Sequence, residues 1–111
     1  MKIIISNAFS LSMLDRETQR KSADYAVIPR PCDDPYEFLV EWDGATIESA
    51  VGHADTAAVF SSILGRPVAV NRVNVKLDQQ TILLVGQYIG PRLPEGATTL
   101  PDGATIEWWT L

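Results

Sequence analysis

The sequence predicts a single α/β domain, with a mixed sheet of about five strands and helices packed on it. Short β-branched or apolar runs of strand length alternate with two segments that have helical spacing and helix-boundary residues. The chain has 111 residues, enough for one hydrophobic core and too few for two. No internal repeat, low-complexity segment or linker divides it, so 1–111 is expected to fold as one unit.

The composition is that of an ordinary globular protein, with 46% hydrophobic and 21% charged residues. No apolar run approaches the roughly 20 residues that cross a bilayer. The start, MKIII, lacks the apolar region and cleavage site of a secretory signal, so a cytoplasmic protein without membrane contact is expected. The net charge of −5 argues against broad binding to DNA or RNA. It leaves room for a small anionic ligand in a local pocket.

Cysteine and histidine occur once each, as Cys32 and His53. A single cysteine excludes an intrachain disulfide, and one cysteine with one histidine disfavours a Cys/His metal site within one chain. The sequence contains no Walker-type glycine loop, no HExxH and no GxSxG. We therefore expect neither a metal nor a cofactor.

The N-terminal part of the chain is expected to supply two strands. Residues 2–6 (KIIIS) form a β-branched run typical of a buried strand. Residues 24–30 (DYAVIPR) are predicted as a second strand, in which Pro29 marks an edge position or the strand's end. Between them, 15–22 is charged and shows no apolar face, so a loop or surface turn is expected there.

A helix start is indicated by Asp33-Asp34-Pro35, an aspartate cap followed by proline at the first helical position. The apolar residues that follow fit a short amphipathic helix ending near Gly44. A strand through 37–42 is the alternative that the sequence leaves open. Residues 46–51 are ambiguous.

A second helix is predicted between His53 and Gly65. Ala57, Phe60 and Leu64 recur at three- and four-residue spacing, so one face is apolar. Glycine is typical of a helix C-cap, and a proline follows two residues beyond it.

The period then switches to two over 70–77, which predicts a strand with Arg72 and Lys76 on one face. Residues 78–80 (DQQ) join it to a second apolar run at 81–88, so the two runs are predicted to form a hairpin. Because the sequence ILLV is apolar on both faces, the second strand is expected inside the sheet.

Residues from about 89 to 103 are dense in proline and glycine. Loops of this length without structure of their own are uncommon and are often functional, for example as lids. We therefore expect a ligand-closing loop here, followed by a final strand at 104–111.

The candidate chemistry centres on His53, directly after a glycine and before a helix. Backbone N–H groups and the helix dipole favour anions at such a position, and Arg72 and Lys76 add positive charge. This is a suitable place to hold a phosphate, although a lone histidine is more often structural and the two cations fit a solvated face equally well. Three polar residues are candidates either for ligand contacts or for turn hydrogen bonds: Asn7, Ser10 and Ser12.

Four blocks then appear in a recognisable order: ISNAFSLSML at 5–14, SAVGHADTAAVFSSILG at 49–65, NRVNVKL at 71–77 and PRLPEG at 91–96. Together they resemble the viral type III anti-CRISPR ring nucleases, a family of small proteins that degrade the second messenger cyclic tetra-adenylate. The resemblance covers most of the chain apart from roughly 15–45 and the tail.

The resemblance implies a homodimer that binds one ring-shaped ligand across its two-fold axis. It implies metal-independent cleavage to linear di-adenylate with a 2′,3′-cyclic phosphate, which would suppress type III CRISPR signalling. The implied catalytic residues are His53, Arg92 and Glu95: His53 would be the general acid, and the other two would lie on a loop that closes over the ligand. The remaining implied ligand contacts are Asn7, Ser10 and Arg72, with Ser12 standing where some relatives carry asparagine and Lys76 as a further cation.

Two other functions remain open on the sequence. The protein could bind and sequester cyclic oligoadenylates without cutting them. It could instead be a structural or regulatory viral protein that uses Trp108 and Trp109 for protein contacts.

Overall fold

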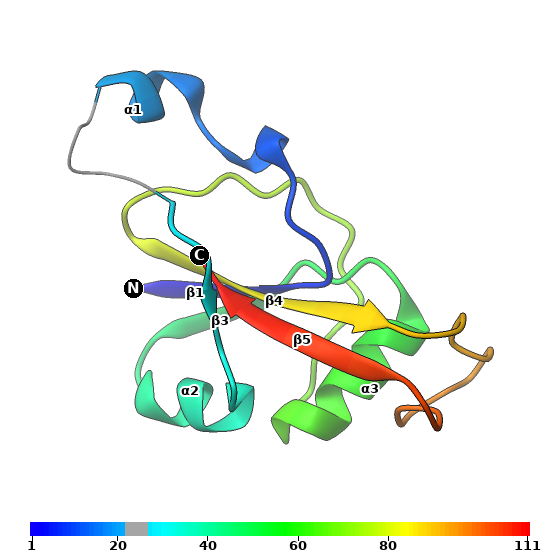
Figure 1. Ribbon diagram of the computed structural model, residues 1–111. Coiled ribbons are helices and arrows are strands. Elements are labelled where there is room, and N and C mark those ends of the chain that lie inside the picture. Colours follow the sequence, from blue (N-terminus) through cyan, green and yellow to red (C-terminus); the bar gives the residue numbers. More distant parts are fainter. Residues whose placement is uncertain (22–26) are drawn as a thin grey trace.

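A mixed five-stranded sheet with strand order β2-β5-β4-β1-β3 forms the centre of the computed structural model, which describes residues 1–21 and 27–111 (Figure 1). β3, β1 and β4 run parallel, β5 runs antiparallel to β4, and β2 runs antiparallel to β5. The predicted α/β class with a mixed sheet is confirmed. The elements in chain order are β1 (Lys2–Ser6), a 3₁₀ helix η1 (Leu11–Met13), α1 (Arg16–Lys21), β2 (Arg30–Pro31), α2 (Pro35–Glu41), β3 (Thr46–Ser49), α3 (Ala54–Leu64), β4 (Thr81–Ile89) and β5 (Thr105–Thr110).

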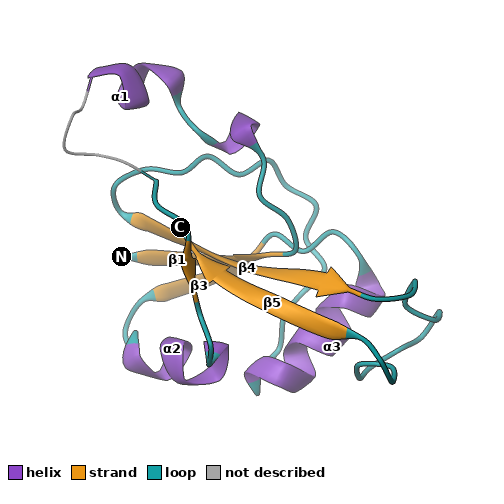
Figure 2. Ribbon diagram, viewed as in Figure 1, coloured by secondary structure: helices purple, strands orange, loops and turns teal. Residues whose placement is uncertain are grey.

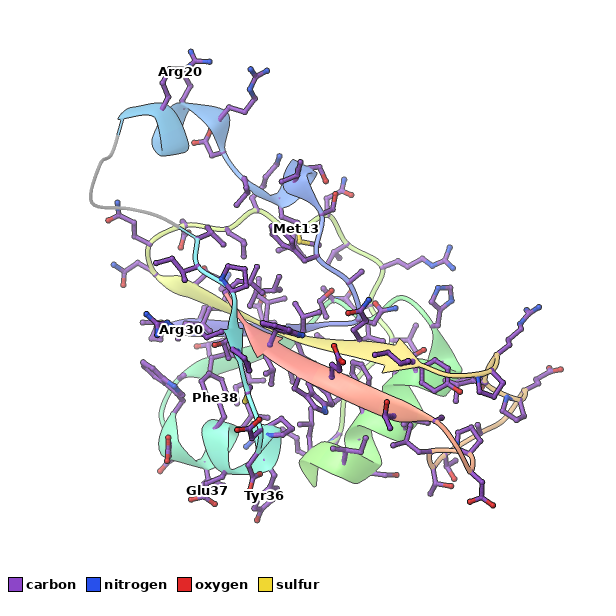
Figure 3. All side chains as sticks on the ribbon, viewed as in Figure 1. Met13, Arg20, Arg30, Tyr36, Glu37 and Phe38 are labelled. Carbon is purple, nitrogen blue, oxygen red and sulfur yellow. The ribbon has the colours of Figure 1, made fainter. Side chains whose placement is uncertain are left out.

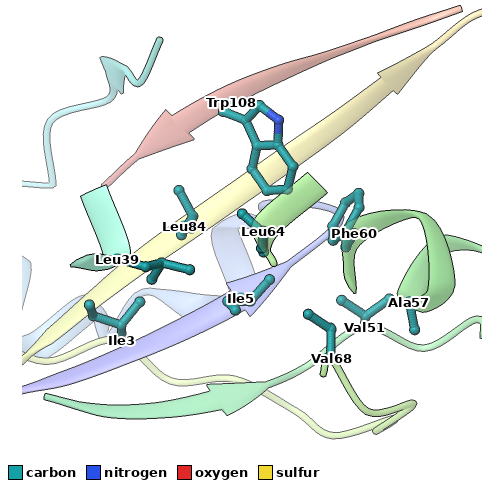
Figure 4. Close-up of a cluster of buried hydrophobic side chains, with 10 residues drawn as sticks. All are labelled: Ile3, Ile5, Leu39, Val51, Ala57, Phe60, Leu64, Val68, Leu84 and Trp108. Carbon is teal, nitrogen blue, oxygen red and sulfur yellow. The ribbon is translucent and has the colours of Figure 1, made fainter. Parts of the chain in front are cut away.

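The two faces of the sheet are covered differently (Figure 2). Helices α2 and α3 lie on one face, and the main core forms between them and the sheet (Figure 4). On the other face, η1 and the irregular segment 71–78 pack on a smaller cluster. No helix among the described residues is both long and apolar enough to span a bilayer.

Aromatic packing fixes the centre of the main core. The Phe60 ring of α3 lies 4.7 Å from the Trp108 ring of β5, between centroids, and Phe60 is fully buried. Gly86 of β4 lies beneath both rings, and a Cβ added there would come within 2.7 Å of Phe60 Cζ and of Trp108 Cζ3. The close approach of the two rings to the sheet therefore requires glycine at this position.

Pro35–Glu41 folds as the predicted helix, α2, and not as the alternative strand. The Asp34 side chain accepts a hydrogen bond from the Glu37 backbone N–H at 3.0 Å, and Pro35 stands in the first turn. Tyr36 and Glu37 point away from the sheet, whereas Phe38 points toward it (Figure 3). The ambiguous residues 46–51 supply β3 and a single bridge between Val51 and Val70.

The predicted hairpin of 70–77 with 81–88 is wrong. Only Val70 makes a bridge, and 71–78 is irregular, while β4 pairs with β1 and β5. The period of two has another cause, because Val75 and Leu77 are buried against the second sheet face and anchor a loop. Asp78 ends this loop by accepting hydrogen bonds from Thr81 Oγ1 and the Gln80 N–H, both at 2.8 Å, which lower the pKa of its carboxyl.

Two further predictions need correction. Residues 16–21, expected as part of a loop or turn, form α1; the Asp15 side chain accepts from the Glu17 N–H at 3.2 Å at its start. The strand predicted at 24–30 is reduced to β2, because 27–29 is irregular and 24–26 lies outside the described residues. The final strand is confirmed as β5, and the 81–88 strand is confirmed inside the sheet as β4.

Candidate functional site

His53 occupies the N-cap position of α3, with extended backbone angles of φ −129° and ψ 135°. Its side chain makes no capping hydrogen bond, and no partner for it exists within residues 1–21 and 27–111. The imidazole is exposed. It is therefore available to an external group.

The residues around His53 follow the carboxyl ends of three parallel strands. Asn7 comes directly after β1, His53 shortly after β3, and Arg92 shortly after β4. Because β3, β1 and β4 are parallel neighbours, the carboxyl ends of these strands lie next to one another along one edge of the sheet. Open α/β sheets bind their ligands at this edge.

Two cavities meet at His53. The first has a volume of about 440 Å³ and is lined by Ser6, Asn7, Ala8, Met13, Ala50, Gly52, His53, Arg72, Val73 and Asn74. The second has a volume of about 360 Å³ and is lined by His53, Asp55, Thr56, Tyr88, Gly90, Arg92 and Leu93. His53 thus lines both a cavity that contains Arg72 and a cavity that contains Arg92.

Arg72 is held beside His53 by backbone contacts. Its Nε donates to the Gly52 carbonyl at 3.1 Å, and its Cγ would lie only 3.0 Å from a Cβ at Gly52. The preceding residue, Asn71, donates from its backbone N–H to Val51 and from its side chain to Ser49, both at 2.8 Å. Glycine at position 52 therefore lets the guanidinium lie against the chain that leads to His53.

Arg92 lies on a loop, 90–104, which extends beyond the ends of β4 and β5 next to α3 (Figure 1). The Tyr88 hydroxyl donates to the Pro91 carbonyl at the root of this loop. The predicted irregular segment at about 89–103 is confirmed, except that Ile89 still belongs to β4. Its closure over a ligand stays a prediction.

The other four candidate residues do not line either cavity at His53. Ser10 caps η1, and its hydroxyl lies 3.0 Å from that of Ser12. Lys76 Nζ donates to the Ser12 carbonyl, and both residues line a separate cavity of about 620 Å³. Glu95 is exposed on the loop. Because 71–78 is not a strand, the expectation that Arg72 and Lys76 share a strand face is wrong.

The sequence matches a family model described as STIV B116-like over residues 3–104. The chain belongs to the STIV B116-like family. Among solved structures, this B116-like chain is similar to B116 of Sulfolobus turreted icosahedral virus, with 24% sequence identity and a TM-score of 0.73. The similarity covers 99% of this chain and 97% of that one, so the two folds correspond over their whole length. No match was found among curated proteins.

Several site residues of the B116-like chain were not singled out from sequence. Asp55, Thr56 and Tyr88 line the cavity that contains Arg92. A signal for the first two existed, because they stand within three residues of the histidine in the GHADT block.

An apolar cavity of about 310 Å³ adjoins the site through Asn7 and Ala8; its other lining residues are Phe9, Pro29, Val85, Gln87, Trp109 and Leu111.

The only cysteine of the B116-like chain lies outside this site. The Cys32 backbone N–H donates to the Trp108 carbonyl at 2.8 Å, and burial raises the pKa of its thiol. Within the described part of the chain, no three histidine, cysteine, aspartate or glutamate side chains gather at one point.

Proposed function

We propose that this protein is a metal-independent ring nuclease that cleaves cyclic tetra-adenylate to linear di-adenylate ending in a 2′,3′-cyclic phosphate. In the cytoplasm of an infected host cell, this activity would suppress type III CRISPR signalling. The observation that carries the proposal is the meeting of His53, Arg72, Arg92 and Asn7 around two adjoining cavities. Each of these four residues comes from a different one of the four sequence blocks of the resemblance, and the family is named after a viral protein.

The reaction needs no activated water. A ribose 2′-oxygen attacks the adjacent phosphorus, the bond from phosphorus to the 5′-oxygen breaks, and the hydroxyl proton is lost to solvent. Because the nucleophile is tethered to its target, the protein has to align the two groups, stabilise the developing charge and protonate the leaving oxygen. His53 would protonate the departing 5′-oxygen, a task suited to an exposed imidazole without a partner among the described residues.

Charge stabilisation would come from the two sides of His53. Arg72 lines one of the two cavities that share His53, and Arg92 lines the other, so each cavity contains one arginine. The first N–H groups of α3 add partial positive charge at the same point. A phosphate held there would be stabilised most as negative charge develops in the transition state. We assign Glu95, exposed on the loop, to loop positioning and not to proton transfer.

A dimer follows from the symmetry of the ligand. A ring of four equivalent phosphates matches a two-fold axis, since each subunit can present the same patch to half the ring. Two His53 side chains would then make the two cuts. Light scattering should give the mass of a dimer, and titration should give one ring bound per two chains.

The proposal is tested by incubating the protein with cyclic tetra-adenylate in excess chelator and resolving the products by chromatography. Linear di-adenylate with a cyclic phosphate is expected. A protein that binds the ring and yields no product would be a sequestering protein. If the protein does not bind the ring, its resemblance to ring nucleases would be one of fold alone.

The substitution Gly52→Ala tests the placement of Arg72. The new Cβ would lie 3.0 Å from Arg72 Cγ and 3.4 Å from its Nε, so the side chain must shift and its hydrogen bond to the Gly52 carbonyl is expected to weaken or break. We expect cyclic tetra-adenylate to bind about five- to tenfold more weakly by calorimetric titration, equivalent to one hydrogen bond of about 1–1.5 kcal/mol.

The control for this prediction is a double-mutant cycle with Arg72→Ala. If Gly52→Ala acts through the guanidinium, it should add nothing to the loss caused by Arg72→Ala. Additive losses would show that the glycine serves another purpose.

A further inference from the structure

We infer that Asp55 is a positioning residue that fastens the loop 90–104 to the start of α3, beside His53. Asp55 Oδ1 accepts a hydrogen bond from the Gly96 backbone N–H at 3.0 Å, across 41 positions of the sequence. Its side chain lines the cavity that also contains His53 and Arg92. One carboxylate thereby connects the helix that begins after His53 to the loop that carries Arg92 and Glu95.

The loop depends on few contacts of this kind. It contains no helix or strand, and its internal hydrogen bonds are the turns that Ala97 closes with Pro94 and Ala104 with Pro101, each at 3.1 Å. Ser62 Oγ of α3 donates to the Thr98 carbonyl at 2.8 Å farther along. The bond from Asp55 thus holds the turn that Ala97 closes with Pro94, at the residue directly after Glu95.

A carboxylate at this position needs an explanation, because a negative charge in a phosphate cavity opposes binding of the ligand. Two features of the structure supply it. Asp55 stands in the first turn of α3, where the helix dipole stabilises a negative charge. A charged acceptor also makes a stronger hydrogen bond to a backbone N–H than a neutral one. The side chain is therefore suited to holding the loop and unsuited to contacting the phosphate.

Limited proteolysis with trypsin measures how readily the loop opens, because the loop contains the cleavable bond between Arg92 and Leu93. The bond between Lys76 and Leu77 lies in another irregular segment, 71–78, away from the contact with Gly96, so cutting there serves as an internal reference for protease activity and for changes that affect the whole protein. For Asp55→Ala we expect the ratio of cutting at Arg92 to cutting at Lys76 to rise about tenfold. In this variant the loop can open without breaking the charge-assisted hydrogen bond between Asp55 and Gly96, so it is open more often. For Asp55→Asn, which keeps an oxygen acceptor, we expect a change of less than about threefold.

Asp43→Ala is the matched control for loss of one exposed carboxylate, because Asp43 lies in the turn after α2. Its trypsin ratio should equal that of the unmodified protein. An unchanged ratio in Asp55→Ala would overturn the inference. An equal rise in Asp43→Ala would also overturn it, because the effect would then follow net charge and not the contact with Gly96.

The consequence for catalysis rests on the proposed function. If the fastened loop is the state that binds the ring, Asp55→Ala should raise KM for cyclic tetra-adenylate about tenfold and leave kcat within about threefold. Asp55→Asn should restore KM. A fall in kcat in both variants with an unchanged trypsin ratio would give the carboxylate a chemical role and contradict a positioning one. If the unmodified protein does not cleave the ring, the proposed function fails, whereas the trypsin result still decides the role of Asp55.

Discussion

Replacement of His53 by alanine is expected to slow cleavage of cyclic tetra-adenylate about 10²- to 10⁴-fold while the ring still binds. This range is the usual contribution of a positioned general acid. The substitution removes a side chain that has no hydrogen-bond partner in the described structure, so the fold should be unaffected. Single-turnover rates in excess chelator, with affinity from calorimetry, measure the two effects separately.

His53→Asn is the matched control for this prediction. Position 53 is the N-cap of α3, where asparagine is among the preferred residues and can accept a hydrogen bond from the helix start. The asparagine variant should therefore melt at the same temperature as the unmodified protein, or higher, and still be inactive. Cleavage within about tenfold of the normal rate in either variant would contradict a general-acid role.

The largest expected effect on stability is that of Phe60→Ala, a loss of about 3–5 kcal/mol in the free energy of unfolding. Phe60 is 0% exposed, and its ring packs on Trp108 above Gly86. A domain of this size is typically stable by about 5–15 kcal/mol, so the variant should be close to unfolding. Urea denaturation followed by circular dichroism measures the change.

Val40→Ala is the control for this core prediction. Val40 is 48% exposed on α2, and its truncation should change the free energy of unfolding by less than about 0.5 kcal/mol. A loss below about 1 kcal/mol for Phe60→Ala would mean that the core at this point is not as closely packed as the contacts at Gly86 require.

The elements that the sequence predicted correctly are those whose signals are local. The helix α3 has apolar residues at helical spacing and ends at Gly65, whose φ of 66° is the left-handed conformation that glycine favours at a C-cap. α2 has its cap and proline in adjacent positions. β4 is apolar on both faces because both faces of the sheet are covered.

The error at 70–77 has a physical origin. Alternation of apolar and polar residues reports which side chains are buried, and it does not report whether the backbone pairs with another strand. Val75 and Leu77 are buried as they would be in a strand, yet they belong to a loop that lies on the sheet face. The choice between the two depends on β4 pairing with β1, a contact distant in sequence.

The candidate site, like the fold, could be predicted from the sequence only in part. Asn7, His53 and Arg92 were grouped from the sequence only through the family resemblance, because the parallel pairing of β3, β1 and β4, which brings these strand ends together, was not predicted. The placement of Lys76 beside Ser12 depends on how the irregular segment 71–78 lies next to η1, a contact between segments distant in sequence that no local pattern reports. The contact between Asp55 and Gly96 could not be predicted, because it joins a helix to the tip of a loop without regular structure.

In the proposed mechanism, the site around His53 directs a ribose hydroxyl, and not water, at the phosphate. The most direct test is cleavage of cyclic tetra-adenylate in excess chelator and in water enriched in heavy oxygen, with the first products analysed by mass spectrometry. We predict di-adenylate with a 2′,3′-cyclic phosphate that carries no heavy oxygen. A first product that carries heavy oxygen on its phosphate would show attack by water and contradict the proposed mechanism.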